Sequence, residues 1–117
     1  MDNSIIADKS KAFALRIIRL KKYLAAEKRE YSMANQIVRS GTSIGSNIRE
    51  ARRAQSDADF IHKLCISLKE ADETQYWLEL LHESDYINDA IYLSMNKDCD
   101  EIIRILVSII KTKRRSG

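Results

Sequence analysis

The sequence predicts an all-α protein, an antiparallel up-down-up-down four-helix bundle that forms one domain over residues 1–117. The chain has no proline and three glycines, one of them the last residue. A fold rich in strands needs more turn residues at this length, so this composition argues against one. Charged residues make up 32% and hydrophobic residues 44% of the chain, a balance typical of amphipathic helices. Apolar residues also recur at spacings that alternate between three and four, which is the period of one helix face.

The first two helices are predicted from their apolar seams. The first covers residues 5–28, and its seam comprises Phe13, Ile17, Leu20 and Leu24. The charged residues 28–30 mark a turn, after which the second helix covers residues 31–54. The seam of the second helix comprises Ile37, Gly41, Ile44, Ile48 and Ala51. Each helix is therefore expected to bury one face.

The third and fourth helices are predicted from start signals as well as from period. Ser56 followed by Asp59 resembles a capping box and starts a helix over residues 57–84. Asn88 or Asp89 can cap the fourth helix, over residues 88–114. Short turns between helices of similar length make sequential neighbours antiparallel. The apolar residues of these two helices cover more than one face, which indicates a second buried surface and hence an oligomer.

Two glycines inside the second helix predict a close contact. Each glycine costs roughly 1 kcal/mol relative to alanine in a helix interior, so Gly41 and Gly45 need a packing or binding reason. They stand four residues apart and therefore share one face. A missing Cβ there lets the backbone of another helix approach closely. We expect another helix to pack on this face.

Charge is distributed unevenly along the chain, although its net value is only +3. Residues 1–29 carry eight Lys or Arg against three acids, whereas residues 56–87 carry two against eight. Basic and acidic helices can pair with each other in the fold or in an oligomer, or the basic helices can face a polyanion. For pairing across the bundle, the sequence favours Arg39 with Glu73; Arg49 and Glu70 are further candidates.

A second set of basic residues can contact phosphates. No aromatic residues interleave with them as in a base-stacking platform, and no helix-turn-helix motif is present. Contacts to the backbone of structured RNA therefore suit them better than base reading. The candidate nucleic-acid-binding residues are Arg16, Arg19, Lys22, Arg49, Arg52, Arg53, Lys111, Lys113, Arg114 and Arg115.

The sequence predicts no catalytic residues, cofactor or metal. Two pairs, Asp59 with His62 and Glu79 with His82, have the spacing of metal ligands on a helix. They lie on the same predicted helix, 20 residues or about 30 Å apart, so they cannot share one metal site. The residues around Gly41 lack the spacing of a phosphate-binding loop. Cys65 and Cys99 form no C-x-x-C pair and are expected to be reduced. No apolar run is long enough for a signal peptide or a membrane span, so we expect a cytoplasmic protein.

Several segments, taken in order, resemble a known family. They are residues 13–17, Arg39-Ser-Gly-Thr-Ser-Ile-Gly-Ser-Asn-Ile-Arg-Glu-Ala51, and residues 59–64, 68–78 and 109–112. The chain is similar here to the bacterial 23S rRNA intervening-sequence proteins, also called four-helix-bundle proteins. It is similar too to the accessory variability protein of diversity-generating retroelements, a basic pentameric barrel that binds a reverse transcriptase and RNA.

The resemblance implies an antiparallel four-helix bundle that assembles as a homopentamer. It assigns no catalytic role to the signature residues, which are explained by packing and assembly. These helix-packing and assembly residues are Arg39, Gly41, Ile44, Gly45, Asn47, Ile48, Glu50, Lys69, Glu70, Glu73, Tyr76 and Trp77.

Two functions fit the sequence. The first is a non-enzymatic cytosolic oligomer that binds structured RNA, or an RNA-bound protein, through its basic surface. The second is a scaffold or adaptor that contacts protein partners only, with the basic helices satisfied by the acidic helix of a neighbouring subunit. Neither function involves a membrane or a small-molecule substrate.

Overall fold

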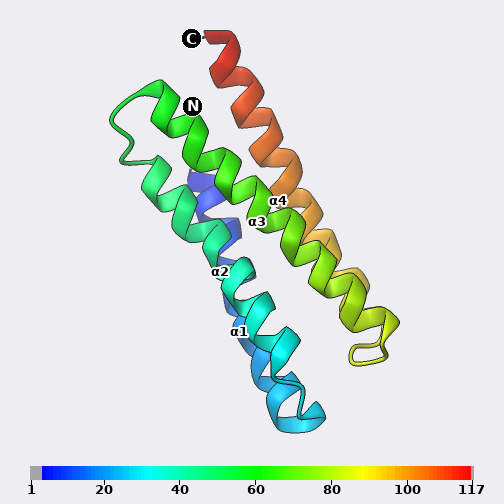
Figure 1. The fold of residues 1–117 in the computed structure, drawn as a ribbon. Coiled ribbons are helices and arrows are strands. Elements are labelled where there is room, and N and C mark those ends of the chain that lie inside the picture. The colour runs from blue at the N-terminus through cyan, green and yellow to red at the C-terminus, as the bar shows by residue number, and fades with distance from the viewer. Residues whose placement is uncertain (1–3, 117) are drawn as a thin grey trace.

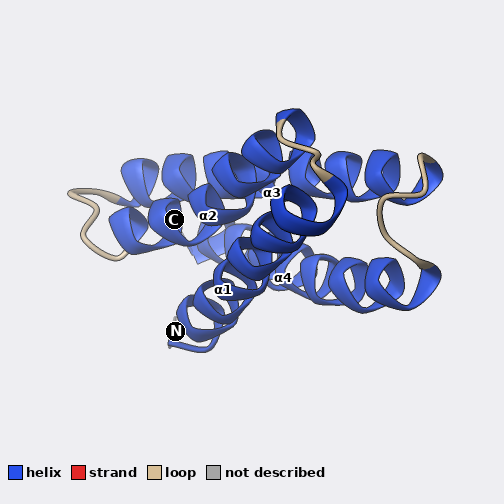
Figure 2. Ribbon diagram, turned by 90° about the horizontal axis from the view of Figure 1, so that it is seen from below, coloured by secondary structure: helices blue, strands red, loops and turns tan. Residues whose placement is uncertain are grey.

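Four helices account for nearly all of residues 4–116, which are the residues that the computed structural model describes (Figure 1). They are α1 (Ser4–Lys28), α2 (Ser32–Ala51), α3 (Asp57–Glu83) and α4 (Asp89–Ser116). Three short loops connect them, and no strand occurs among the described residues (Figure 2). The molecule measures 47 × 21 × 19 Å. The predicted all-α class is confirmed.

The helices form a ring in which each packs on two neighbours. Packing joins α1 to α2, α2 to α3, α3 to α4 and α4 to α1, while no Cα atoms of the diagonal pairs approach within 8 Å in residues 4–116. This is the up-down-up-down arrangement that the helix lengths and short turns predict. The start of α1, the end of α2, the start of α3 and the end of α4 consequently share one end of the bundle (Figure 1).

The predicted helix boundaries are right within two residues except at the end of the second helix. α2 ends at Ala51 rather than at residue 54, and Arg52 and Arg53 form a turn. There the N–H of Arg53 bonds to the Glu50 carbonyl and the N–H of Ala54 to the Ala51 carbonyl, both at three-residue spacing. The backbone tightens because no further buried apolar position follows Ala51 to hold a regular helix turn.

Both predicted helix starts are capped as expected. The Ser56 hydroxyl accepts a hydrogen bond from the Asp59 N–H at 3.1 Å, and the Asn88 side chain accepts one from the Ile91 N–H at 2.8 Å. The other half of the predicted capping box differs, since the Asp59 carboxylate accepts from the Gln55 N–H instead of the Ser56 N–H. Asn88 rather than Asp89 is the cap of α4, so each start satisfies one otherwise unpaired N–H.

The predicted apolar seams form the core. Phe13, Ile17 and Leu24 of α1 are at most 1% exposed, and the seam of α2 is buried from Ile37 to Ala51. On α3 and α4, apolar residues outside the main buried stripe also pack against the core. Partly buried residues that pack against the core include Phe60, Ile61, Cys65, Leu68, Trp77, Ile103 and Ile105.

Close packing of α1 on α2 explains the two glycines of α2. A Cβ added at Gly41 would lie 2.8 and 2.9 Å from the two γ-carbons of Ile17, and one added at Gly45 would lie 3.3 Å from the Ser10 hydroxyl. The prediction that another helix packs on this face is therefore confirmed. The covering helix is α1 of the same chain.

Small polar side chains mark the other helix contacts. The buried Ser67 hydroxyl of α3 donates to the Ile44 carbonyl of α2 at 2.8 Å, and Thr74 of α3 donates to the Ser40 hydroxyl of α2 at 2.9 Å. The Cys99 thiol of α4 donates to the Ala71 carbonyl of α3 at 3.4 Å. Because these side chains are short, they can reach the facing helix only where the two backbones lie close together. Each buried polar group is thereby satisfied.

Replacing the two glycines by alanine should separate their roles. Gly41→Ala is expected to lower the free energy of unfolding by about 1–2 kcal/mol, because the atoms it meets are at the branch of the buried Ile17 side chain and cannot rotate away. Gly45→Ala meets a hydroxyl that can rotate, and its gain of about 1 kcal/mol in helix propensity offsets the small shift. It should stay within about 0.5 kcal/mol of wild type. Urea unfolding followed by circular dichroism measures both, and equal losses would contradict this packing.

The two free cysteines should differ in reactivity. Burial, aided by the carboxylates of Asp72, Asp100 and Asp98, raises the pKa of Cys99 to about 12 from its ordinary 9.0. The stability that this shift reflects is fully present below pH 9 and is lost as the pH rises toward 12. At pH 8 a thiol reagent should label the half-buried Cys65 in the folded protein and both thiols in urea. Rapid labelling of Cys99 in the folded protein would contradict the prediction.

Candidate nucleic-acid interface

One end of the bundle collects basic residues from three helices. The end of α2 contributes Arg49 and continues into Arg52 and Arg53, the end of α4 carries a basic tail, and the start of α1 carries Lys11. Seven of these cations form no ion pair with any residue in the range 4–116. They are Lys11, Arg49, Arg52, Arg53, Lys111, Arg114 and Arg115, and they are here called the basic end. All seven are exposed.

Three arginines of the basic end surround a shared hollow. Arg49, Arg52 and Arg53 line an open depression of about 430 Å³. The cluster forms because Arg52 and Arg53 follow Arg49 by three and four residues and continue the path of α2 for one tightened turn, so the three side chains lie on one side of the helix end. Guanidinium groups without carboxylate partners present planar sets of N–H donors that match phosphate oxygens.

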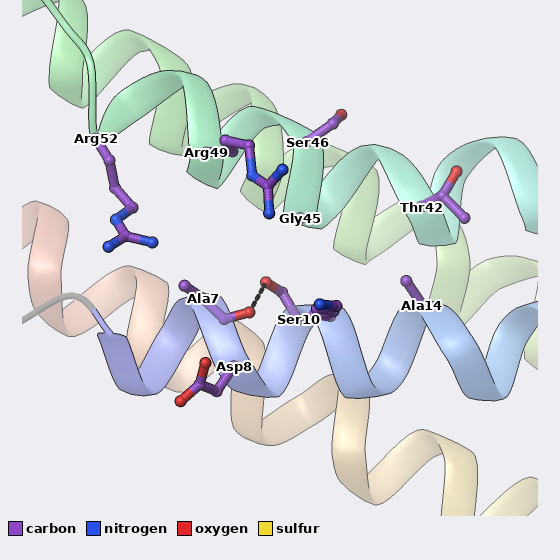
Figure 3. A pocket seen from close by; sticks show the side chains of 10 residues that line it. Ala7, Asp8, Ser10, Ala14, Thr42, Gly45, Ser46, Arg49 and Arg52 are labelled. Carbon is purple, nitrogen blue, oxygen red and sulfur yellow. Dashed lines mark hydrogen bonds between the residues drawn. The ribbon is translucent and has the colours of Figure 1, made fainter.

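A groove of about 370 Å³ runs from this cluster between α1 and α2. Several of its lining residues are small: Ala7 and Ala14 lie to either side of Ser10 on α1, and Gly45 lies on α2 (Figure 3). Its charged lining residues are Lys11, Arg49 and Arg52 together with one acid, Asp8. In Figure 3 the Arg49 and Arg52 side chains extend from α2 toward α1, whereas Asp8 points away from α2.

The basic tail of α4 is partly committed to the fold. Lys113 forms an ion pair with Asp57 at 3.0 Å and lies 5.6 Å from the centre of the Phe60 ring. The Arg114 guanidinium lies 3.8 Å from the Cys65 sulfur. Lys111 and Arg115 are exposed. Of the four predicted phosphate-contacting residues in this tail, Lys113 is thus the one that an acidic residue within 4–116 already neutralises.

The predicted phosphate-contacting residues of α1 lie apart from the basic end. Arg16 donates to Asp98 at 2.5 Å and to the Ser94 hydroxyl at 2.9 Å, and so joins α1 to α4. Arg19 and Lys22 are exposed, but they follow Arg16 along α1 toward the opposite end of the bundle. The predicted phosphate-contacting residues therefore do not form one continuous surface, and Arg16 instead links α1 to α4.

The signature residues of α2 and α3 form a contact between these two helices. Arg39 forms ion pairs with Glu73 and, at 3.2 Å, with Glu70, while the Trp77 indole N–H donates to Glu73 at 2.9 Å. The favoured pairing of Arg39 with Glu73 is confirmed, and it occurs within one chain. Tyr76 is exposed and meets Trp77 edge to face, with 5.5 Å between ring centres. Lys69 is exposed.

Glu50 extends this contact on α2. Glu50 forms an ion pair with Lys63 of α3 at 3.0 Å, and its hydrogen bond and charge raise the pKa of Lys63. Asn47 donates to the Ser43 carbonyl of its own helix. Ile44 and Ile48 are buried in the core. Two acids of α3 therefore pair with Arg39 of α2, whereas Arg49, Arg52 and Arg53 form no ion pair within residues 4–116.

The described residues give no sign of a metal centre or a membrane segment. No group of three or more His, Cys, Asp or Glu side chains in residues 4–116 could hold a metal ion. His82 bonds to Asp89 at 2.6 Å and stacks on Tyr92, and His62 is exposed. None of the four helices is both long and apolar enough to span a bilayer.

Comparison with known proteins identifies the class of this helical bundle. Residues 2–108 match the family described as 23S rRNA-intervening sequence protein. The chain therefore belongs to this family.

A solved structure agrees with that assignment. It is a protein of unknown function from the S23 ribosomal protein family of Bacteroides thetaiotaomicron VPI-5482. The two chains are 57% identical and superpose with a TM-score of 0.93, and the match covers 95% of this chain and 99% of that one. No curated protein matches the chain. The likeness to the retroelement protein remains an inference from sequence motifs.

Sequence reasoning missed the groove between α1 and α2. Its residues on α1 are small or short, namely Ala7, Ser10 and Ala14, and they recur at spacings of three and four. That stripe, matched with Gly41 and Gly45 on α2, could have indicated which helix the glycines contact. It could not have indicated that Lys11 and Arg49 line one groove, because this depends on the register of the two helices.

Proposed function

We propose that this protein binds structured RNA through its basic end and has no enzymatic activity. The observation that carries the proposal is the gathering of seven cations, unpaired within residues 4–116, at one end of the bundle. Protein cations without carboxylate partners can neutralise phosphates and release the counterions that surround a nucleic acid. The family's description, which names an intervening sequence of 23S rRNA, supports RNA as the polyanion.

Recognition would rest on the RNA backbone rather than on bases. Tyr31 and Tyr76 are the exposed aromatic residues of the described chain, and neither lies at the basic end. Stacking of unpaired bases therefore has no platform there. Contacts to phosphates and to the shape of a folded RNA remain, and such contacts make affinity strongly dependent on salt.

We further propose that the protein is cytoplasmic and assembles as a homopentamer, as its resemblance to the family implies. Large apolar side chains remain exposed on the outer faces of the bundle, namely Ile5 and Leu15 on α1 and Leu93 on α4. A neighbouring subunit could cover them. Assembly would also repeat the basic end once per subunit and raise the affinity for a long RNA through multiple contacts.

RNA binding should depend on salt and on the arginine cluster. Fluorescence anisotropy with a labelled RNA hairpin should show affinity falling about 40-fold between ~50 and ~200 mM salt if three duplex phosphates are neutralised. Replacing Arg49, Arg52 and Arg53 together by glutamine should remove most of this dependence. The matched control replaces Arg19 and Lys22 by glutamine, which lie away from the basic end and should change binding little. No binding by the wild type at ~50 mM salt would contradict the proposal and would leave the scaffold function.

Light scattering should give a particle mass of five times the 13.5 kDa chain. Arg39→Ala should keep this mass, because Arg39 is bonded to Glu70 and Glu73 of its own chain and not to a neighbour. A monomer mass for the wild type would contradict the assembly. Loss of the assembly in the Arg39 variant would show that α3 of another subunit takes part, as the scaffold function requires.

A further inference from the structure

We propose that the outer face of α3, the side that points away from the core, binds the outer face of α1 in a second copy of this chain. The inference rests on the proposed assembly and names the two surfaces that form it. A closed ring of identical subunits needs two different, complementary patches on opposite sides of each subunit. α1 and α3 lie at opposite corners of the bundle, since none of their Cα atoms approach within 8 Å in residues 4–116.

A large apolar residue lies at the centre of the outer face of α1. Leu15 stands midway between Phe13 and Ile17, which are both buried, and is itself 47% exposed. Two residues turn a helix by about 200°, so Leu15 points away from the core. Ile18 is half-buried but is not among the residues within 4–116 that pack against the core. Leu15 and Ile18 are here called the α1 patch.

Tyr76 has the matching place on α3. It stands midway between Thr74 and Leu78, which are both fully buried, yet it is itself 54% exposed. Leu80, four residues further on, is half-buried and likewise lies outside the set of residues in 4–116 that pack against the core. Tyr76 and Leu80 are here called the α3 patch. Tyrosine is enriched at protein interfaces, because it combines a large apolar area with a polar end.

The two patches lie at nearly the same height along the bundle. Contacts through α2 place Ile17 of α1 level with Thr74 of α3, because Ile17 faces Gly41 and Thr74 bonds to the neighbouring residue of α2. α1 and α3 both begin at the basic end and run in the same direction. At about 1.5 Å per residue, Tyr76 is therefore about 2 Å from the level of Ile18. Copies related by rotation about an axis along the bundle bring the patches together and point every basic end the same way.

Charges around the two patches are opposite in sign, so each patch fits the other patch on a second copy. Next to the α1 patch, Arg19 and Lys22 are exposed and form no ion pair with any residue in 4–116. Three acids beside the α3 patch are exposed and equally unpaired in that range, namely Asp72, Glu79 and Glu83. Attraction between these two sets favours a contact of α1 with α3 over a contact of either helix with its own copy.

These charges lie at the rim of the contact, because the apolar patches occupy its centre. Exposed ion pairs guide the approach and fix the register of an interface but contribute little to its affinity. Each face also carries an exposed charge of the other sign, Asp8 on α1 and Lys69 on α3. Neutral substitutions of Arg19 and Lys22 should therefore leave the assembly intact, whereas a charge placed inside an apolar patch should break it.

The test places charges at the centres of the two patches. In Leu15→Glu the new carboxylate would face the acids of α3 in the neighbouring copy, and in Tyr76→Lys the new ammonium would face the cations of α1 there. Each single variant should reduce the particle mass in light scattering from that of five chains to the 13.5 kDa of one. Combining both substitutions puts opposite charges across the contact and should restore the large particle.

The matched control is Tyr31→Lys, because Tyr31 is 58% exposed and precedes α2 at the end of the bundle opposite the basic end. It should keep the full mass, and circular dichroism checks the helix content of every variant. If wild type assembles and either single variant keeps the full mass, the inference is wrong while the assembly stands. If the double variant stays monomeric, the two faces do not meet and the inference is also wrong. If wild type is a monomer, both the inference and the assembly fail.

Discussion

The close approach of α1 to α2 is the constraint on which the other features depend. Gly41 and Gly45 bring the α2 backbone against the Ile17 and Ser10 side chains of α1. This contact sets the register of the two helices, and the register brings Lys11 and Arg49 to the same groove. A helix interior that accepts two unfavourable glycines must recover their cost from packing. Here the same glycines that permit the contact also leave a groove beside it.

Ion pairs between α2 and α3 distinguish Arg39 from the arginines at the end of α2. Glu70 and Glu73 of α3 bind Arg39, while Lys63 of α3 binds Glu50 of α2. The pairs of Arg39 lie near the middle of α2, and the pair of Glu50 lies at its end. Beyond Ala51, Arg52 and Arg53 form no ion pair within residues 4–116, and Asp57 at the start of α3 pairs with Lys113 of α4. An almost balanced net charge of +3 can therefore coexist with a strongly basic end.

Part of the candidate site follows from the sequence and part does not. Arg49, Arg52 and Arg53 are close in the chain, so their clustering is a local property that any helix end would preserve. Arg16 had the same status in the sequence as these residues, yet it joins α1 to α4 through Asp98 and Ser94. Asp98 is 82 residues away along the chain, and local periodicity contains no information about such a partner.

Sequence alone determined the four helices, the cap at Ser56, a cap at Asn88 or Asp89, the buried seams and the need for a close helix contact at Gly41 and Gly45. These depend on hydrogen bonds and on the 3.6-residue period, which act over a few neighbouring positions. Tertiary structure decided that α1 covers the glycines, that α2 ends at Ala51, and that a groove opens beside Arg49. Those outcomes depend on side-chain shape and charge across helices distant in sequence, which only the assembled bundle brings together.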